Sequence, residues 1–283
     1  MSELSDLLDK IPGTRVVVMG DPMFDVYHFG RVDRLSPEAP VPVFVPETRE
    51  TRYGGAANVM QQLKALECQV ATIFPPAKEW TVKHRYMVGR HQMFRVDKDR
   101  IPSDDSMRHV FNVLAIPTAQ AVVISDYDKG WCSTDHCRSV TVTATVSKIP
   151  VIVDPKGANW GKYEGARLIC PNEREWMQRL QANAALPEAG ILLKMGEKGL
   201  QLIDPAGGRV PIRMKQDFPA KARHVYDVTG AGDTVTAVMA AVIGASGRHD
   251  LGAELANLAA GYVVGEVGTS VCPLAKLREL VKA

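Results

Sequence analysis

Four short apolar runs recur along the chain, and each gives way to polar or glycine-containing sequence at its end. They are Arg15–Gly20, Ala121–Ile124, Val151–Val153 and Ile191–Leu193. Continuous apolar runs of this length are typical of strands buried on both faces, as in parallel sheets. We therefore expect four strands of one buried sheet, with ligands gathered at their carboxyl ends.

Helical segments are expected between these strands. Ala56–Leu66 follows a Gly-Gly turn, Ser103–Leu114 has apolar residues near a 3.6-residue spacing, and Asn172–Leu180 follows a proline. Alternating strands and helices predict an α/β fold, a doubly wound and mostly parallel sheet flanked by helices. Gly196–Gly199 predicts a tight turn, with Leu200–Ile203 as the returning strand.

Two segments break this alternation. Residues 27–53 contain four prolines and short β-prone pieces without a helical period, and residues 84–97 alternate like a pair of strands. Together they predict a small β appendage beside the main sheet, which could act as a lid.

Composition narrows the functional classes. A chain of 283 residues with 46% hydrophobic residues suits one large domain over 1–283, and a net charge of +2 gives no footprint for nucleic acid. No apolar run is long enough for a membrane span, and the polar start of the chain does not resemble a signal peptide. Five scattered cysteines suit free thiols, and the Cys132, His136 and Cys137 group matches metal-ligand spacing poorly. We expect a cytoplasmic protein without nucleic-acid or membrane partners.

The sharpest motif is Asp227–Asp233, which reads Asp-Val-Thr-Gly-Ala-Gly-Asp and precedes small and apolar residues at helical spacing. Gly-Ala-Gly at a helix entrance aims unpaired N–H groups at one point, which makes an anion site. Asp233 would project into the same space, where a carboxylate can accept the proton of an attacking hydroxyl. A plain helix N-cap is the alternative. The two aspartates that bracket the heptapeptide favour the functional interpretation.

Two further groups of polar residues follow predicted strands or turns. Gly54 and Gly55 open a helix and allow close approach of a ligand, and Asn58 offers a donor and an acceptor one turn later. A tight packing turn is the alternative for the glycines. Asp21 and Asp25 follow the first strand, where carboxylates can bind sugar hydroxyls, although Asp21 before proline could merely start a turn.

Asn172 and Glu175 lie on one face of a predicted helix. An amide and a carboxylate at this spacing suit Mg²⁺ held through its waters, and they also match a capping box; both can hold together. Lys156, after the third strand, could neutralise phosphate charge, although solvated lysines in turns are commoner.

In order and spacing, three of these motifs resemble the ribokinase (PfkB) family of carbohydrate kinases: Gly54–Asn58, Asn172–Glu175 and Asp227–Asp233. The resemblance spans nearly the whole chain. It implies a ribokinase-like fold, ATP as phosphoryl donor, Mg²⁺, and Asp233 as the base that deprotonates a sugar hydroxyl. The other implied positions are Gly230, Ala231 and Gly232 as an anion hole, Asn172 and Glu175 as the Mg²⁺-phosphate motif, and Lys194, Gly196, Gly199 and Asn257 at the nucleotide.

A narrower resemblance is to the kinases of ADP-heptose synthesis, which phosphorylate O1 of D-glycero-D-manno-heptose 7-phosphate. It is carried above all by Ser36–Val43, a stretch that most ribokinase-like enzymes lack. It implies a sugar phosphate substrate and a homodimer formed through the β lid. The substrate-binding residues that we expect are Asp21, Asp25, Gly54, Gly55, Asn58, Arg90 and Lys156.

The sequence departs from the family pattern in its middle. Family members carry a further α/β unit before the returning lid strands, whereas Ala71–Phe74 here runs through two prolines almost directly to Trp80. This departure leaves two alternatives open: a kinase of the same fold for another sugar or a nucleoside, or a catalytically idle homologue that binds sugar or nucleotide.

Overall fold

The computed structural model describes residues 3–103, 113–184, 186–205, 212–221, 225–266 and 268–282. The helices are α1 (Glu3–Leu8), α2 (Ala56–Ala65), α4 (Thr134–Val146), α5 (Glu173–Gln181), α6 (Ala231–Ser246), α7 (His249–Val263) and α8 (Leu274–Lys282). The strands are β1 (Arg15–Gly20), β2 (Pro22–Leu35), β3 (Pro42–Gly55), β4 (Gln69–Ile73), β5 (Thr81–Val88), β6 (His91–Lys98), β7 (Ala121–Ser125), β8 (Val151–Asp154), β9 (Leu168–Ile169), β10 (Gly190–Lys194), β11 (Leu200–Pro205) and β12 (Ile212–Phe218).

The main sheet has the strand order β12-β11-β10-β9-β8-β7-β1-β4. The six strands from β10 to β4 are parallel, and the hairpin of β11 and β12 adds two antiparallel strands at the far edge. The four strands predicted from apolar runs are β1, β7, β8 and β10. The prediction of a mostly parallel doubly wound sheet is therefore confirmed.

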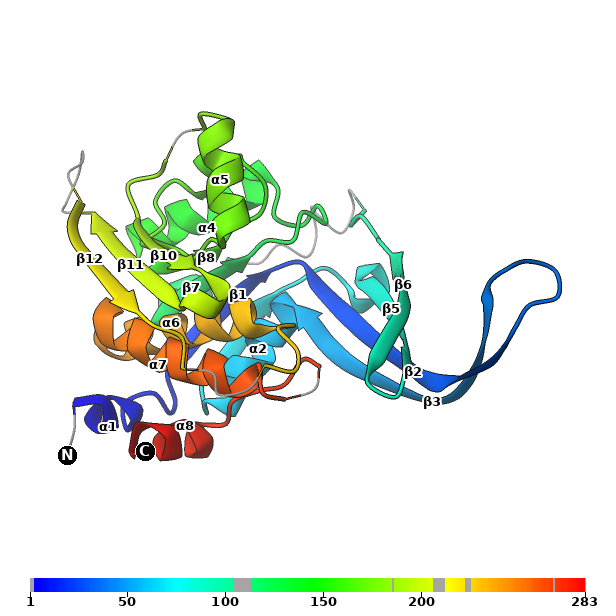
Figure 1. Cartoon of the computed structure of the whole chain (residues 1–283). Coiled ribbons are helices and arrows are strands. Elements are labelled where there is room, and N and C mark those ends of the chain that lie inside the picture. The colour runs from blue at the N-terminus through cyan, green and yellow to red at the C-terminus, as the bar shows by residue number, and fades with distance from the viewer. Residues whose placement is uncertain are drawn as a thin grey trace.

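Helices cover both faces of this sheet, with α4 and α5 on one side and α2, α6 and α7 on the other (Figure 1). The alternation along β1 explains why the run is apolar throughout. Val16 and Val18 pack in the cluster with α2, α6 and α7, whereas Val17 and Met19 pack in the cluster with α4. Both faces of each central strand need apolar side chains because both faces are covered.

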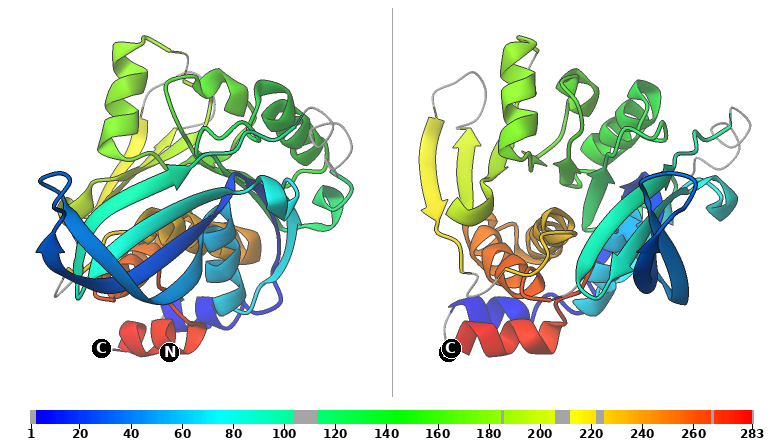
Figure 2. Two further views of the ribbon diagram at one scale, coloured as in Figure 1. Left: turned by 90° about the vertical axis from the view of Figure 1, so that its right-hand side faces the viewer. Right: turned by 45° about the vertical axis from the view of Figure 1, so that its right-hand side comes forward.

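A second sheet projects from one end of the molecule (Figures 1 and 2). This small sheet has the order β3-β2-β5-β6, with β2 and β5 parallel and the other two pairs antiparallel. The predicted β appendage is present, and its strands extend beyond the predicted 27–53 and 84–97. They do so because β2 begins two residues after β1 ends and β3 runs up to the first turn of α2.

The predicted helices Ala56–Leu66 and Asn172–Leu180 correspond to α2 and α5. Most of the predicted helix Ser103–Leu114 lies outside the described residues. After β4 the chain passes through a short 3-10 helix, Ala77–Glu79, into β5. In the described chain β4 is thus an edge strand of the main sheet. No helix in the described ranges is long and apolar enough to cross a membrane.

The turn that joins β10 to β11 depends on two glycines with positive φ. Gly196 has φ 58° and open space where a Cβ would stand, whereas Gly199 has φ 93° and a Cβ there would lie 2.0 Å from the carbonyl oxygen of Phe218. The predicted hairpin is confirmed, and only the second glycine is required by a close approach of backbone.

This difference gives a test of the turn. We expect Gly196→Ala to lower the free energy of unfolding by about 1 kcal/mol, the strain of a left-handed residue with a Cβ. Gly199→Ala adds a clash with backbone and should cost about 3 kcal/mol. Urea unfolding of both variants measures the difference, and equal losses would contradict this account of the turn.

Candidate active site

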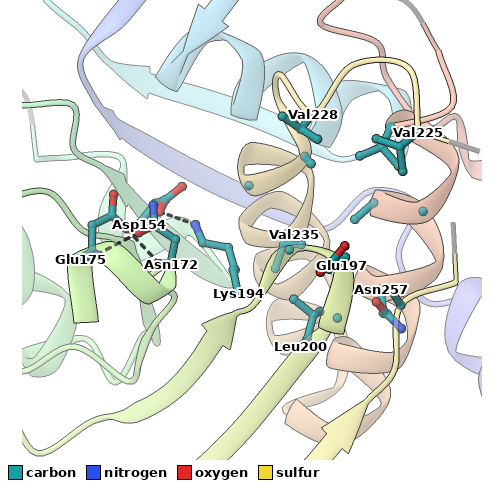
Figure 3. Close-up of a pocket in the computed structure, with 18 of the residues that line it drawn as sticks. Asp154, Asn172, Glu175, Lys194, Glu197, Leu200, Val225, Val228, Val235 and Asn257 are labelled. Carbon is teal, nitrogen blue, oxygen red and sulfur yellow. Dashed lines mark hydrogen bonds and ion pairs between the residues drawn. The ribbon is translucent and has the colours of Figure 1, made fainter. Parts of the chain in front are cut away.

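A cavity of about 750 Å³ lies beside the start of α6 and has two chemically different ends (Figure 3). One end carries the charged side chains of Asp154, Glu175 and Lys194. The other end is mostly apolar: its lining includes Leu200, Val225, Val228, Val235 and Val264, with Glu197 and Asn257 beside Leu200. An elongated ligand with an apolar group and an anionic group would match this division.

Asp233 lies in the first turn of α6 and is 3% exposed. Its Oδ1 accepts a hydrogen bond of 2.5 Å from the Tyr127 hydroxyl, and its Oδ2 accepts one of 2.8 Å from Asn58 Nδ2. Burial and the nearby Asp154 carboxylate raise the pKa of Asp233 to about 7, although both hydrogen bonds act to lower it. A carboxylate with such a pKa can take or give a proton near neutral pH.

The glycines of the motif let neighbouring groups approach α6. Gly230, the N-cap, has φ 84°, and a Cβ there would lie 2.8 Å from Asn58 Nδ2. A Cβ on Gly232 would lie 3.3 Å from Lys194 Nζ. The amide of Ala231 donates to the Val228 carbonyl at 3.3 Å, whereas no acceptor in the described part of the backbone pairs with the amide of Gly232. An ammonium and a helix N-terminus therefore meet at one point, as an anion site requires.

Lys194 forms a buried ion pair with Asp154, and Nζ lies 2.6 Å from Oδ1. Burial disfavours the charged ammonium, but Asp154 and other nearby acids outweigh it and raise the pKa of Lys194. Burial also raises the pKa of Asp154, with Lys194 acting against it. Lys194 is thus held charged beside the N-terminus of α6.

Asn172 and Glu175 form the capping box of α5. Asn172 Oδ1 accepts from the Glu175 amide and Glu175 Oε2 accepts from the Asn172 amide, both at 2.9 Å. The other carboxylate oxygen of Glu175 accepts from Lys156 Nζ at 3.0 Å. All three residues line the cavity, so the helix cap and the cavity wall are the same structure.

The two aspartates after β1 have separate structural partners. Asp21 accepts from the backbone amides of Tyr127 at 2.9 Å and Trp131 at 3.0 Å, and thus shapes the loop that carries Tyr127. Burial raises the pKa of Asp21 to about 6, with these hydrogen bonds acting against it. Asp25 lies on β2 and pairs with Arg85, whose Nη2 is 2.9 Å from Oδ1. Their expected contacts with substrate stay predictions.

Gly54 and Gly55 end β3 at close approaches that exclude a Cβ. A Cβ on Gly54 would lie 2.3 Å from Asp25 Oδ2, and one on Gly55 would lie 2.6 Å from the Asp21 carbonyl oxygen. Gly55 has φ 57° and is the N-cap of α2, which places Asn58 against Asp233. The tight packing turn is therefore present, and it serves to position Asn58.

The remaining predicted residues lie at different distances from the charged end. Asn257 and the turn glycines Gly196 and Gly199 line the cavity, and Asn257 Nδ2 donates to the Pro219 carbonyl at 2.7 Å. Arg90 lies at the exposed tip of the β5–β6 hairpin, outside the cavity lining, with its guanidinium 5.7 Å from the centre of the Tyr226 ring.

Two site residues were missed as candidates. Tyr127 contacts the Asp233 carboxylate, and Asp154 holds Lys194. Both lie at or just beyond the carboxyl ends of β7 and β8, and that position was the available signal. His136 Nδ1 lies 2.8 Å from the Trp131 carbonyl oxygen, which ties the side chain to the loop before α4. All five cysteines are buried free thiols.

The raised pKa of Asp233 makes a prediction for stability. Asp233 ionises near 3.8 when free and near 7 in the fold, so between these values only the folded chain retains the proton. The free energy of unfolding therefore falls as pH rises from about 4 to about 7. Asp233→Asn should remove this fall. Compared with the wild type, the free energy of unfolding of the variant should be little changed at pH 4 and higher by on the order of 2 kcal/mol at pH 8, as measured by chemical denaturation.

The exposed Asp135, in the first turn of α4, provides the matched control. Asp135→Asn should show no pH-dependent gain. An Asp233→Asn gain of the same size at pH 4 and pH 8 would contradict the raised pKa.

The sequence is similar to a family model and to proteins of known activity. Residues 99–276 match the family model described as pfkB family carbohydrate kinase. The bifunctional protein HldE of Caulobacter vibrioides is 35% identical over 97% of this chain and 65% of the relative's own length. The D-beta-D-heptose 7-phosphate kinase of Bordetella bronchiseptica is 35% identical over 95% of this chain and 96% of that protein. The Caulobacter alignment spans 316 positions, more than the 283 residues here, so that relative carries segments that this chain lacks.

Solved structures show the same fold. Arabidopsis thaliana ribokinase, complexed with ribose and ATP, is 18% identical and superposes with a TM-score of 0.66 over 96% of this chain and 99% of that one. Escherichia coli phosphofructokinase-2, in complex with potassium, gives a TM-score of 0.70 at 14% identity over 95% and 98%. The fold is therefore ribokinase-like, and with the family match and the heptose kinase relative the chain belongs to the pfkB family of carbohydrate kinases.

Proposed function

We propose that the protein transfers the γ-phosphoryl group of ATP to a hydroxyl of a sugar phosphate. The acceptor that we propose is O1 of D-glycero-D-manno-heptose 7-phosphate, which would become the 1,7-bisphosphate. The observation that carries the proposal is the Asp233 carboxylate, buried at the start of α6 beside Lys194 and an open cavity.

Asp233 acts as the base. Its oxygens are oriented by Tyr127 and Asn58, and its pKa of about 7 lets it accept the proton of the acceptor hydroxyl as that oxygen attacks phosphorus. Each carboxylate oxygen has a second lone pair, so the present hydrogen bonds leave room for the acceptor.

The anion site stabilises the charge that moves with the phosphoryl group. The Lys194 ammonium lies 3.3 Å from the place of a Cβ on Gly232, at the entrance of α6 formed by Gly230, Ala231 and Gly232, and phosphoryl transfer depends mainly on such positioning and charge stabilisation. The adenine of ATP fits the apolar end of the cavity near Val225 and Val228, and its phosphates reach the charged end.

Glu175 and Asn172 would hold Mg²⁺ through its waters. Their side-chain oxygens already serve the capping box and Lys156, so they suit contacts to a hydrated ion better than direct ligation. Mg²⁺ would neutralise nucleotide phosphate charge at this end of the cavity.

The small sheet belongs to the acceptor side. Its strands carry Asp25, Gly54 and Gly55, and we propose that it covers the acceptor as a lid. The edge strand β6 is exposed along its length and presents Phe94 and Val96, which supports the proposed homodimer through this sheet. The acceptor identity is supported by the relatives, because this chain matches nearly the whole length of a D-beta-D-heptose 7-phosphate kinase.

An ADP-release assay with heptose 7-phosphate, ribose 5-phosphate and fructose 6-phosphate tests the proposal. We expect the highest kcat/KM with heptose 7-phosphate. Asp233→Asn should reduce its turnover by about 10²- to 10⁴-fold, because the base is lost, while ATP binding by calorimetry changes little.

Asp135→Asn is again the matched control and should behave as wild type. Undiminished turnover in Asp233→Asn would refute the mechanism. A wild-type preference for another phosphate would refute only the acceptor assignment, and ATP binding without ADP release on any sugar would indicate an idle homologue.

A further inference from the structure

One face of the small sheet carries two rows of mostly charged side chains. Across β3, β2, β5 and β6 the ladder registers give Arg52, Asp25, Lys83 and Asp97 in one row and Glu50, Tyr27, Arg85 and Arg95 in the next. We call this the inner face, because a Cβ on Gly268, which hydrogen-bonds to Asp227 of the motif, would touch Arg52 and Tyr27. Four of these side chains are cations and three are carboxylates.

Each arginine of the inner face is paired with one carboxylate. Arg85 Nη2 lies 2.9 Å from Asp25 Oδ1, Arg95 Nε lies 2.7 Å from Asp97 Oδ1, and Arg52 Nη2 lies 3.1 Å from Glu50 Oε2. These pairs use all three acids. Lys83 is the fourth cation, and it has no ion pair or hydrogen bond to any residue that the structure describes.

Lys83 lies close to the residue that holds the candidate base. Its Nζ lies 5.8 Å from the centre of the Tyr127 ring, and the hydroxyl of that ring donates to Asp233. Burial lowers the pKa of Lys83, with the Asp25 carboxylate acting against this effect. A half-buried ammonium without a carboxylate partner is costly, and a bound anion would offset that cost.

A second polar group on the inner face also lacks a partner. Tyr27 is 3% exposed, and its hydroxyl has no hydrogen bond within the described residues. In native structures nearly all such groups have a hydrogen-bond partner, from the protein, from water or from a ligand. Lys83 and Tyr27 occupy adjacent strands and adjacent rows, so the Lys83 ammonium and the Tyr27 hydroxyl, both without a hydrogen-bond acceptor among the described residues, belong to one small region.

We propose that Lys83 binds the phosphate group that the acceptor sugar already carries, an inference that rests on the proposed function. With the acceptor hydroxyl at Asp233, the rest of the sugar lies between α6 and the small sheet. Its phosphate then meets the one inner-face cation that no carboxylate holds. An ammonium offers three donors to phosphate oxygens, and this charge-assisted contact selects phosphorylated over free sugars.

Lys83→Met keeps the length of the stem and removes the charge. We expect the KM for heptose 7-phosphate to rise by about 10- to 100-fold, the usual effect of losing a charged hydrogen bond. The kcat should stay within a few-fold, and the KM for ATP should not change. The preference for heptose 7-phosphate over unphosphorylated heptose should fall by the same factor as the KM rises.

Lys98→Met is the matched control, because Lys98 is exposed and pairs with Val82, which places it on the opposite face of the same sheet. It should keep wild-type constants. Circular dichroism and Tm check that each variant folds. If Lys83→Met does not fold, Lys83→Gln removes the same charge and takes its place.

The outcomes separate this inference from the proposed function. If the wild type turns over heptose 7-phosphate and Lys83→Met has the same KM for it, the role of Lys83 is overturned and the proposed function is not. A rise in the KM for ATP instead would also overturn that role, because Lys83 would then serve the nucleotide. A wild-type protein that turns over no sugar phosphate would overturn both.

Discussion

The structure around the site depends on keeping one carboxylate out of water at the start of a helix. Asp233 would be ionised far below neutral pH in solvent, and burial opposes that ionisation. The fold balances the two by placing two hydrogen-bond donors on the carboxylate, Tyr127 from the loop after β7 and Asn58 from α2. Each donor is itself fixed, because Asp21 holds the loop and Gly55 sets the start of α2.

The charges around this carboxylate are divided between two sides. On the cavity side, Lys194 pairs with Asp154 and Lys156 with Glu175, so each cation has an acid to neutralise it until a polyanion binds. On the side of the small sheet, the three inner-face arginines are each paired with a carboxylate, and Lys83 has no ion pair with any described residue. The proposed nucleotide phosphates would lie on the cavity side and the proposed acceptor phosphate on the side of the small sheet, with the acceptor hydroxyl between them at Asp233.

Much of the fold could be predicted from the sequence because its signals are local. Strands buried on both faces require continuous apolar runs, which is why β1, β7, β8 and β10 were found. The short β9 pairs over only two residues and has no such signal. The small sheet was found from its breaks in pattern, but its bounds were too narrow, since Pro22 and Gly55 gave no sign that the strands continue to the site.

The candidate site was predictable where one motif carries its own geometry. Gly230 and Gly232 predicted the start of a helix. In the structure the missing Cβ of Gly230 allows Asn58 to approach closely, and that of Gly232 allows Lys194 to do so. The contacts of Tyr127 and Lys83 could not be predicted, because they join segments more than a hundred residues apart or strands whose register the sequence does not state.

The most direct test of the account is a titration of the Asp233 carboxylate itself by NMR, with ¹³C-labelled aspartate and assignment from the signal missing in Asp233→Asn. The account predicts a midpoint near pH 7, because burial and Asp154 disfavour the charged form. A midpoint near 4, the value of an exposed aspartate, would contradict it.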